Sequence, residues 1–200
     1  MKSLIMLLTL LFSLLAAAEK ADIWSESYKY EAAGKYSEAA ALIEKNLNTV
    51  SDKEFANIRF AWLSYMLGNY DDSIRYYRKA LSINSSSIDA RLGITLPYLA
   101  KQECAKVTRY AGQVIEASPW NYTAHVRLMM CEQSRKQWAT LKDHAQRISS
   151  RYPTDATILV YLARSYANLG KTDEAKKNYK RILIRYPGHI EAINYIANVN

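Results

Sequence analysis

The stretch Leu67-Gly68-Asn69-Tyr70 is the clearest copy of a short sequence motif that recurs along the chain at a spacing of 34 residues. Two further legible copies are Ala33-Gly34-Lys35-Tyr36 and Leu169-Gly170-Lys171-Thr172, and the same spacing places weaker copies at Gln102 and Lys136. A fixed period of this length is typical of helical hairpins stacked into an array. The sequence therefore predicts five such hairpins, with no insertion or deletion between them.

Each of these turns is followed by the pattern of a second helix. A small or apolar residue stands five places after the turn and another stands four places further, and this i, i+4 step indicates one face of a helix. A turn former or proline then ends the helix, at Ser51, Ser85, Pro119, Pro153 and Pro187. Each unit is thus helix, turn, helix, turn.

The fifth copy carries a resemblance to a known family through Leu162, Ala163, Tyr166, Gly170, Ala175, Tyr179 and Pro187. These residues resemble the tetratricopeptide repeat pattern. The resemblance implies an all-α, right-handed α-solenoid of about five helix-turn-helix hairpins near residues 20–53, 54–87, 88–121, 122–155 and 156–189, with a capping helix at 190–200. Copies three and four fit less well, because Thr95 and Met129 occupy the small-residue position and Glu132 replaces an aromatic residue. Their register stays open to an error of one residue.

The first 18 residues have the layout of a secretory signal peptide. They carry Lys2, an apolar run from Leu4 to Leu15, and a small-residue site at Ala16-Ala17-Ala18. We expect cleavage before Glu19, which would leave one repeat domain over residues 19–200 in the periplasm or outside the cell. An uncleaved inner-membrane anchor is disfavoured, since the apolar stretch is about 15 residues and spanning a bilayer takes about 20.

The chain has two cysteines, Cys104 and Cys131, on helices that the repeat makes neighbours. An oxidising compartment permits them to form a disulfide. Both positions also suit buried free thiols, which behave as small apolar side chains. A bridge needs Cα atoms within about 7 Å and converging Cβ directions, so the two alternatives remain open at this point.

Charge is distributed unevenly along a chain whose formal net charge is +8. The hairpin at 20–53 sums to −1 and the hairpin at 156–189 sums to +5. Its second helix carries the basic residues Lys176, Lys177, Lys180, Arg181 and Arg185. These residues form either a solvated outer face or a patch that attracts an anionic surface, such as lipid headgroups or an acidic partner. Nucleic acid is not expected as a partner, because an exported protein seldom meets it and no DNA-binding motif spacing is present.

The resemblance also implies a concave groove lined by the first helices, with contacts at their second, fifth, ninth and twelfth positions. The residues that we expect in this groove are Trp24, Tyr28, Phe55, Ile58, Trp62, Tyr65, Leu92, Leu96, Leu99 and Met130. They are apolar and aromatic, as anchors of recognition often are. A register slip would instead make some of them core. Related modules that grip acidic C-terminal tails place Lys and Asn where this chain has Trp24, Tyr28, Ile58 and Trp62, so a partner helix or apolar peptide is the better expectation.

No catalytic or metal-binding pattern is visible in the sequence. His125, His144 and His189 lie in different places without a companion at i+4, and no phosphate-binding loop is present. We therefore expect a non-enzymatic scaffold or adaptor of the cell envelope, without a cofactor, that holds a protein or peptide partner in the groove. The alternatives are a polysaccharide-binding or escort protein whose aromatic residues stack on sugar rings, and self-assembly into homo-oligomers through the groove. Any membrane contact would be peripheral.

Overall fold

The computed structural model describes residues 23–199, and all regular structure in that range is helical. The fold is the all-α solenoid of helical hairpins that the 34-residue period predicts. Its described residues divide into two compact units, 23–103 and 104–199, which are treated separately below. The expected signal peptide at 1–18 lies outside the described residues, and a single domain over 19–200 stays a prediction. Within residues 23–199, no helix has the length and apolar character needed to cross a membrane.

The first unit begins with a helical segment at residues 23–32 and continues with four helices. These are α2 (Tyr36–Asn46), α3 (Lys53–Met66), α4 (Tyr70–Ile83) and α5 (Ile88–Ala100). Helix α3 packs against α2 and α4, and it also contacts α5, the first helix of the next hairpin. Its buried residues include Phe60, Ala61 and Leu63, and the ring of Phe60 meets the ring of Tyr76 edge to face at 4.4 Å.

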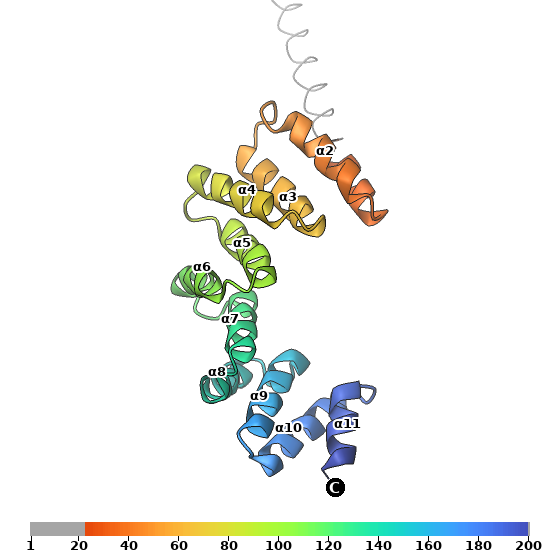
Figure 1. Ribbon diagram of the computed structural model, residues 1–200, viewed down its shortest axis with the longest axis vertical. Helices are drawn as coiled ribbons and strands as arrows, with labels where there is room; N and C mark the ends of the chain where they lie inside the picture. The colour runs from red at the N-terminus through yellow and green to blue at the C-terminus, as the bar shows by residue number, and fades with distance from the viewer. Residues whose placement is uncertain (1–22, 200) are drawn as a thin grey trace, which may run out of the picture. The chain divides into compact units, whose positions relative to one another are not determined.

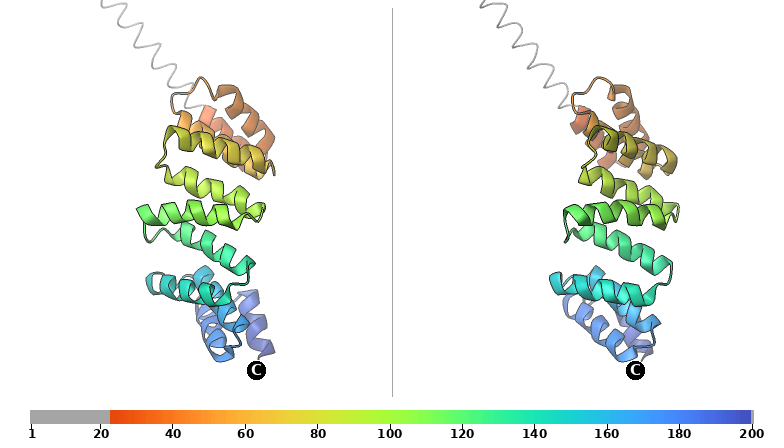
Figure 2. Two further views of the ribbon diagram at one scale, coloured as in Figure 1. Left: turned by 60° about the vertical axis from the view of Figure 1, so that its left-hand side comes forward. Right: turned by 90° about the vertical axis from the view of Figure 1, so that its left-hand side faces the viewer.

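The second unit holds six helices. They are α6 (Cys104–Ala117), α7 (Tyr122–Ser134), α8 (Trp138–Arg151), α9 (Ala156–Asn168), α10 (Thr172–Arg185) and α11 (Ile190–Asn198). Figure 2 shows α6, α7 and α8 following one another as successive layers. One apolar core joins α7, α8 and α9 around Met129, Leu141 and Ile158, and a second joins α9, α10 and α11 around Leu159 and Tyr179.

The turn inside each hairpin contains one residue with a left-handed backbone. Gly34, Gly68 and Gly170 have φ angles of 73°, 77° and 71°, a conformation that glycine adopts without steric cost. Gln102 and Lys136 adopt the same conformation, with φ angles of 60° and 55°. These are the two positions at which the 34-residue spacing predicted the weaker turns. The third and fourth hairpins therefore turn in the same way as the others, although they lack the glycine.

The first helix of a hairpin and the second helix begin differently. Helices α3, α5, α7, α9 and α11 each have a side chain that caps the N-terminus, supplied by Asp52, Ser87, Asn121, Asp155 and His189. Such a cap satisfies a backbone N–H that has no partner within the helix. Helices α2, α4, α8 and α10 have no side-chain cap and begin two residues after the left-handed residue of the turn. The recurring cap fixes where each first helix starts.

Gly93 in α5 marks a close approach between two helices. A Cβ atom at this position would lie 2.2 Å from Cε1 of Tyr77, whose side chain on α4 is buried. The absence of a side chain at Gly93 thus makes room for the Tyr77 ring. Helix α5 runs on through Pro97 to Ala100.

Cys104 and Cys131 are joined by a disulfide, with their Cα atoms 5.5 Å apart. The bond connects the first turn of α6 to α7 within the second unit, and it closes a loop with a sequence separation of 27 residues. Both cysteines are also buried. The alternative of two buried free thiols is thereby excluded in this structure.

A buried chain of hydrogen bonds links α7 to α8 beside this disulfide. His125 Nε2 lies 2.9 Å from the carbonyl oxygen of Pro119, an acceptor, so this nitrogen carries the proton. His125 Nδ1 lies 2.9 Å from Nε2 of His144, and one of these two nitrogens donates to the other. Nδ1 of His144 in turn lies 2.8 Å from a carboxylate oxygen of Glu132. The two histidines thus serve to join helices.

Candidate functional site

The first unit presents an aromatic face on the helical segment 23–32 and on helices α3 and α5. We define this aromatic face by the nine expected groove residues of the first unit, Trp24, Tyr28, Phe55, Ile58, Trp62, Tyr65, Leu92, Leu96 and Leu99. None of the nine belongs to the fully buried core, and Tyr28 is 50% exposed. The tenth, Met130, lies on α7 in the second unit, where it packs half-buried against the core around Met129. That these ten residues bind a partner stays a prediction.

Ring contacts connect the aromatic residues of neighbouring helices. The rings of Trp24 and Phe55 meet edge to face with centroids 4.9 Å apart, which joins the segment 23–32 to α3. The Trp62 and Tyr65 rings are 5.8 Å apart, and Tyr65 is a further 5.8 Å from Tyr70 at the start of α4. Offset and edge-to-face pairs at such distances are favourable arrangements of aromatic rings. The rings of the face thus form two groups of contacting side chains, one at Trp24 and Phe55 and one at Trp62 and Tyr65.

An ion pair lies beneath this surface. The side chain of Arg59 is only 4% exposed and pairs with the carboxylate of Glu31, which is 21% exposed. Arg59 also donates to the backbone oxygen and the hydroxyl of Ser27, both at 3.1 Å. Its guanidinium lies 4.0 Å from the centroid of the Tyr28 ring, which is a cation–π contact. The buried charge is thus well supplied with partners, as burial of a charge requires.

Glu31 ties the ion pair to the aromatic face. While one of its oxygens receives Arg59, the other accepts a hydrogen bond of 2.6 Å from Nε1 of Trp62. The indole is therefore oriented by a charge that is itself fixed from α3. Aromatic side chains held in this way lose little conformational entropy when a partner binds.

The sequence did not single out Arg59 and Glu31 as site residues. The two residues are 28 positions apart, which is not the 34-residue spacing of the repeat. Nothing in the sequence therefore indicates that their side chains meet. The one available signal is an arginine among apolar residues in the middle of a helix, because a charge there needs a partner.

The second unit presents a different surface on its first helices. A hollow of about 240 Å³ is lined by Ala156, Thr157, Val160, Tyr161, Arg164, His189 and Glu191. Arg164 on α9 pairs with Glu191 on α11 through two hydrogen bonds of 2.8 and 2.6 Å, and it donates to Gln133 on α7 at 3.0 Å. The Arg164 and Glu191 side chains are 36% and 33% exposed, so this ion pair is open to water.

The electrostatics of this hollow centre on Glu191. Burial opposes its ionisation, but hydrogen bonds from Arg164 and Tyr179 outweigh burial and hold the pKa of Glu191 below its usual value. Burial together with the bond to Glu191 raises the pKa of Tyr179. The carboxylate therefore stays charged at neutral pH and joins three helices of the second unit.

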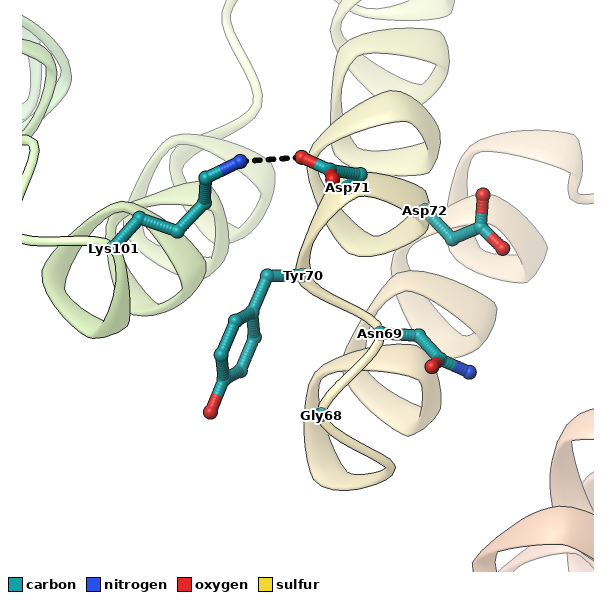
Figure 3. A pocket seen from close by; sticks show the side chains of 6 residues that line it. All are labelled: Gly68, Asn69, Tyr70, Asp71, Asp72 and Lys101. Atoms are coloured by element: carbon teal, nitrogen blue, oxygen red, sulfur yellow. Dashed lines mark hydrogen bonds and ion pairs between the residues drawn. The ribbon is translucent and has the colours of Figure 1, made fainter.

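A second hollow, of about 600 Å³, lies at the start of α4 (Figure 3). Its lining residues are Gly68, Asn69, Tyr70, Asp71, Asp72 and Lys101. Lys101 reaches Asp71 at 2.5 Å, and Asp72 pairs with Arg75 at 2.6 Å on the helix surface. Because these charges are already paired and exposed, the hollow offers a ligand few free groups.

The basic residues predicted as a patch all lie on α10. Lys177, Lys180 and Arg185 are exposed, and Lys176 and Arg181 are half-buried. A shallow hollow of about 380 Å³ is lined by four of them, Lys176, Lys177, Lys180 and Arg181, together with Asp173 and Ile184. Among residues 23–199, no cluster of three or more His, Cys, Asp or Glu side chains could hold a metal ion.

These features define a protein built from helical-hairpin repeats, and family comparison identifies the repeat. Residues 56–87 and residues 158–189 each match a family model described as tetratricopeptide repeat. These two stretches are hairpins that carry clear copies of the recurring sequence motif, at Gly68 and Gly170. The resemblance to the tetratricopeptide repeat is therefore confirmed for them. No curated protein matches the chain in sequence.

Solved structures extend the fold likeness over most of the chain. A tetratricopeptide repeat protein from Parabacteroides merdae has a TM-score of 0.77 and 12% identity, and the match covers 90% of this chain and 71% of that one. A thermophilic tetratricopeptide repeat protein from Thermus thermophilus has a TM-score of 0.65 and 15% identity, with 90% and 97% covered. YrrB, described as a tetratricopeptide repeat protein with an unusual peptide-binding site, has a TM-score of 0.64 and 20% identity, with 78% and 81% covered. At these identities the likeness shows the fold alone.

Proposed function

We propose that the protein is a non-enzymatic interaction scaffold of the cell envelope that holds a partner helix or apolar peptide on the aromatic face of its first unit. The observation that carries this proposal is the Arg59–Glu31–Trp62 arrangement. Aromatic side chains are common anchors of binding surfaces, and here the indole of Trp62 is fixed by a hydrogen bond to a paired carboxylate.

Two further observations support the proposal. The tetratricopeptide fold serves protein–protein interaction in general, and YrrB is a protein of similar fold with a peptide-binding site. The disulfide between Cys104 and Cys131 suits an oxidising compartment, as does the expected signal peptide. Aliphatic residues beside the rings, such as Ile58 and Leu96, favour a polypeptide over a sugar, whose sites usually add converging polar groups.

A selection of displayed random peptides against the full chain tests the proposal. Peptides enriched on the wild type should bind the Trp62→Ala, Tyr65→Ala double variant at least roughly tenfold more weakly, since aromatic hot spots contribute most of the affinity at such surfaces. Trp120→Ala with Tyr186→Ala is the matched control, because these residues are 46% and 50% exposed elsewhere on the chain. The control variant should bind like the wild type. Equal binding by all three proteins would contradict the proposal.

The same variants distinguish a polypeptide partner from the two other candidate occupants of the aromatic face, a second copy of the protein and a polysaccharide. Light scattering that shows a mass above the monomer for the wild type, and a monomer for the Trp62→Ala, Tyr65→Ala variant, would mean that a second copy fills the face. Retention of the wild type alone on envelope polysaccharide would favour the escort hypothesis. Circular dichroism of each variant must show an intact helical fold, because a loss of folding would mean that Trp62 and Tyr65 act as core.

A further inference from the structure

Helix α10 carries a continuous stripe of residues on the side away from its buried face. The buried face consists of Ala175, Asn178, Tyr179 and Ile182. The stripe follows the i, i+3, i+4 spacing of one helix side and is formed by Asp173, Lys176, Lys177, Lys180, Arg181 and Ile184. Asp173 at one end is its single acidic residue. The stripe therefore presents four cations and ends in an apolar side chain.

The cations of this stripe lack carboxylate partners. Within residues 23–199, no carboxylate lies within ion-pair distance of Lys176, Lys177 or Lys180. Arg181 donates to the side-chain oxygen of Asn178 and to the backbone oxygen of Pro153, neither of which is charged. The charge of the stripe is thus left uncompensated by the protein.

The corresponding helix of the first unit, α4, differs from α10 at the matching positions. Its outward cations are occupied within the unit: Arg75 pairs with Asp72, Arg78 donates to the hydroxyl of Tyr98, and Lys79 lies over the ring of Tyr76. Position 82, which corresponds to Ile184 in the repeat, is a serine. The repeat itself therefore requires neither unpaired lysines nor an exposed apolar residue at these places.

Ile184 is the second unusual feature of the stripe. Its side chain is 76% exposed, the largest exposed fraction among the large apolar residues of the described chain. It follows Lys180 and Arg181 by one turn and precedes Arg185, and Tyr186 is also 50% exposed. An apolar side chain among cations on an outward helix side is the composition of surfaces that lie in the headgroup region of a membrane.

We propose that the α10 stripe docks the protein onto an anionic lipid surface. The lysines attract the negative headgroups, and Ile184 enters the boundary between headgroups and acyl chains. An acidic polypeptide would satisfy the lysines through a few fixed carboxylates, but it gives no reason for an isoleucine that is 76% exposed among them. A lipid surface accounts for both, and it leaves the aromatic face of the first unit available for a polypeptide.

Vesicle flotation with the full chain tests this docking. Vesicles of phosphatidylcholine alone are compared with vesicles that also contain about a third phosphatidylglycerol. The readout is the ratio of binding to the two, because the apolar run at residues 4–15 would attach to either kind. A triple variant removes the three lysines, as Lys176→Gln, Lys177→Gln and Lys180→Gln. Its ratio of binding to anionic over neutral vesicles should fall by a factor of about 100, if each lysine contributes about fivefold. Ile184→Asn should lower binding to the anionic vesicles by about fivefold to tenfold.

The control is a triple variant that removes the same charge elsewhere, Lys35→Gln, Lys53→Gln, Lys106→Gln, at exposed positions outside α10. If this control loses as much as the α10 triple, net charge alone governs attachment and the docking surface is refuted. Unchanged binding by Ile184→Asn would overturn the role of the apolar residue. If soluble polyglutamate binds the wild type and displaces it from the vesicles at equal charge concentration, the surface recognises acidic polypeptides instead. Circular dichroism confirms folding of each variant.

Discussion

The two units use the same repeat to build contrasting surfaces. In each, an arginine on one first helix pairs with a glutamate on a neighbouring first helix. In the first unit the pair of Arg59 and Glu31 is buried under aromatic rings, whereas in the second the pair of Arg164 and Glu191 is about one third exposed and lines an open hollow. The first pair holds the aromatic face from below, whereas the second pair is itself part of the exposed lining of the hollow. The second unit is also braced by a disulfide, which the described part of the first does not have.

The largest effect is expected from removing this disulfide. Closing a loop with a separation of 27 residues lowers the entropy of the unfolded chain, which corresponds to about 3–4 kcal/mol of stability. Cys104→Ser with Cys131→Ser should therefore lower the free energy of unfolding of the second unit by that amount. Peptide-resolved hydrogen exchange distinguishes the units. Protection should fall in residues 104–199 and stay unchanged in the first unit, and an equal loss in both would contradict separate units.

The two arginine–glutamate pairs should differ in their contribution to stability. Arg59→Ala leaves Glu31 with one neutral donor in a largely buried place, so we expect a loss of about 3 kcal/mol. Arg164→Ala removes an exposed pair that water can replace, so we expect a loss of about 1 kcal/mol or less. Urea unfolding of both variants measures the difference. Equal losses would show that the burial of the first pair has no energetic consequence.

Gly93 offers a smaller but sharply controlled test of packing in the first unit. Gly93→Ala places a Cβ atom against the buried ring of Tyr77, and overpacking of this kind typically costs about 1–3 kcal/mol. Gly112→Ala in α6 is the control, because no atom lies within 4 Å of its added Cβ and alanine favours a helix by up to about 1 kcal/mol. Thermal melts should shift in opposite directions. A stabilising Gly93→Ala would mean that the Tyr77 ring moves aside freely.

The fold was predictable because its signals recur. Gly68 and Gly170 set the phase, and the period placed the turns at Gln102 and Lys136 although neither residue suggests a turn. The side-chain caps at Asn121 and Asp155 share the same spacing, and each follows a proline by two residues. Repetition thus compensates for weak local propensity, since each hairpin must fit its neighbours.

The site was predictable only in part, since periodicity says which face a residue occupies and not which side chain it meets. It placed Trp62 and Tyr65 on the face of the first helices, yet it did not show that Glu31 binds both Arg59 and Trp62. That choice depends on rotamers and on the distance between two helices. Pairing of Cys104 with Cys131 was left open for the same reason, because converging Cβ directions follow from packing.

The smallest expected effect is a difference between the two units in how their stability depends on pH. All three histidines of the chain lie in the second unit. Burial lowers the pKa of His125, helped by the nearby charges of His144 and Arg147, although the bond to Pro119 and the carboxylate of Glu132 act in the opposite direction. The unfolded chain therefore binds the extra proton more readily than the folded chain. The stability from this group is complete above the unfolded pKa of about 6.5 and falls as the pH drops below it, by at most about 1.4 kcal/mol per pH unit.

Hydrogen exchange between about pH 7.5 and pH 5, which brackets that pKa, should show the second unit losing more stability than the first. His125→Gln should reduce this slope, whereas His189→Asn, which keeps a side chain able to cap α11, should preserve most of it. A slope that survives His125→Gln unchanged would contradict the assignment of the pH response to His125.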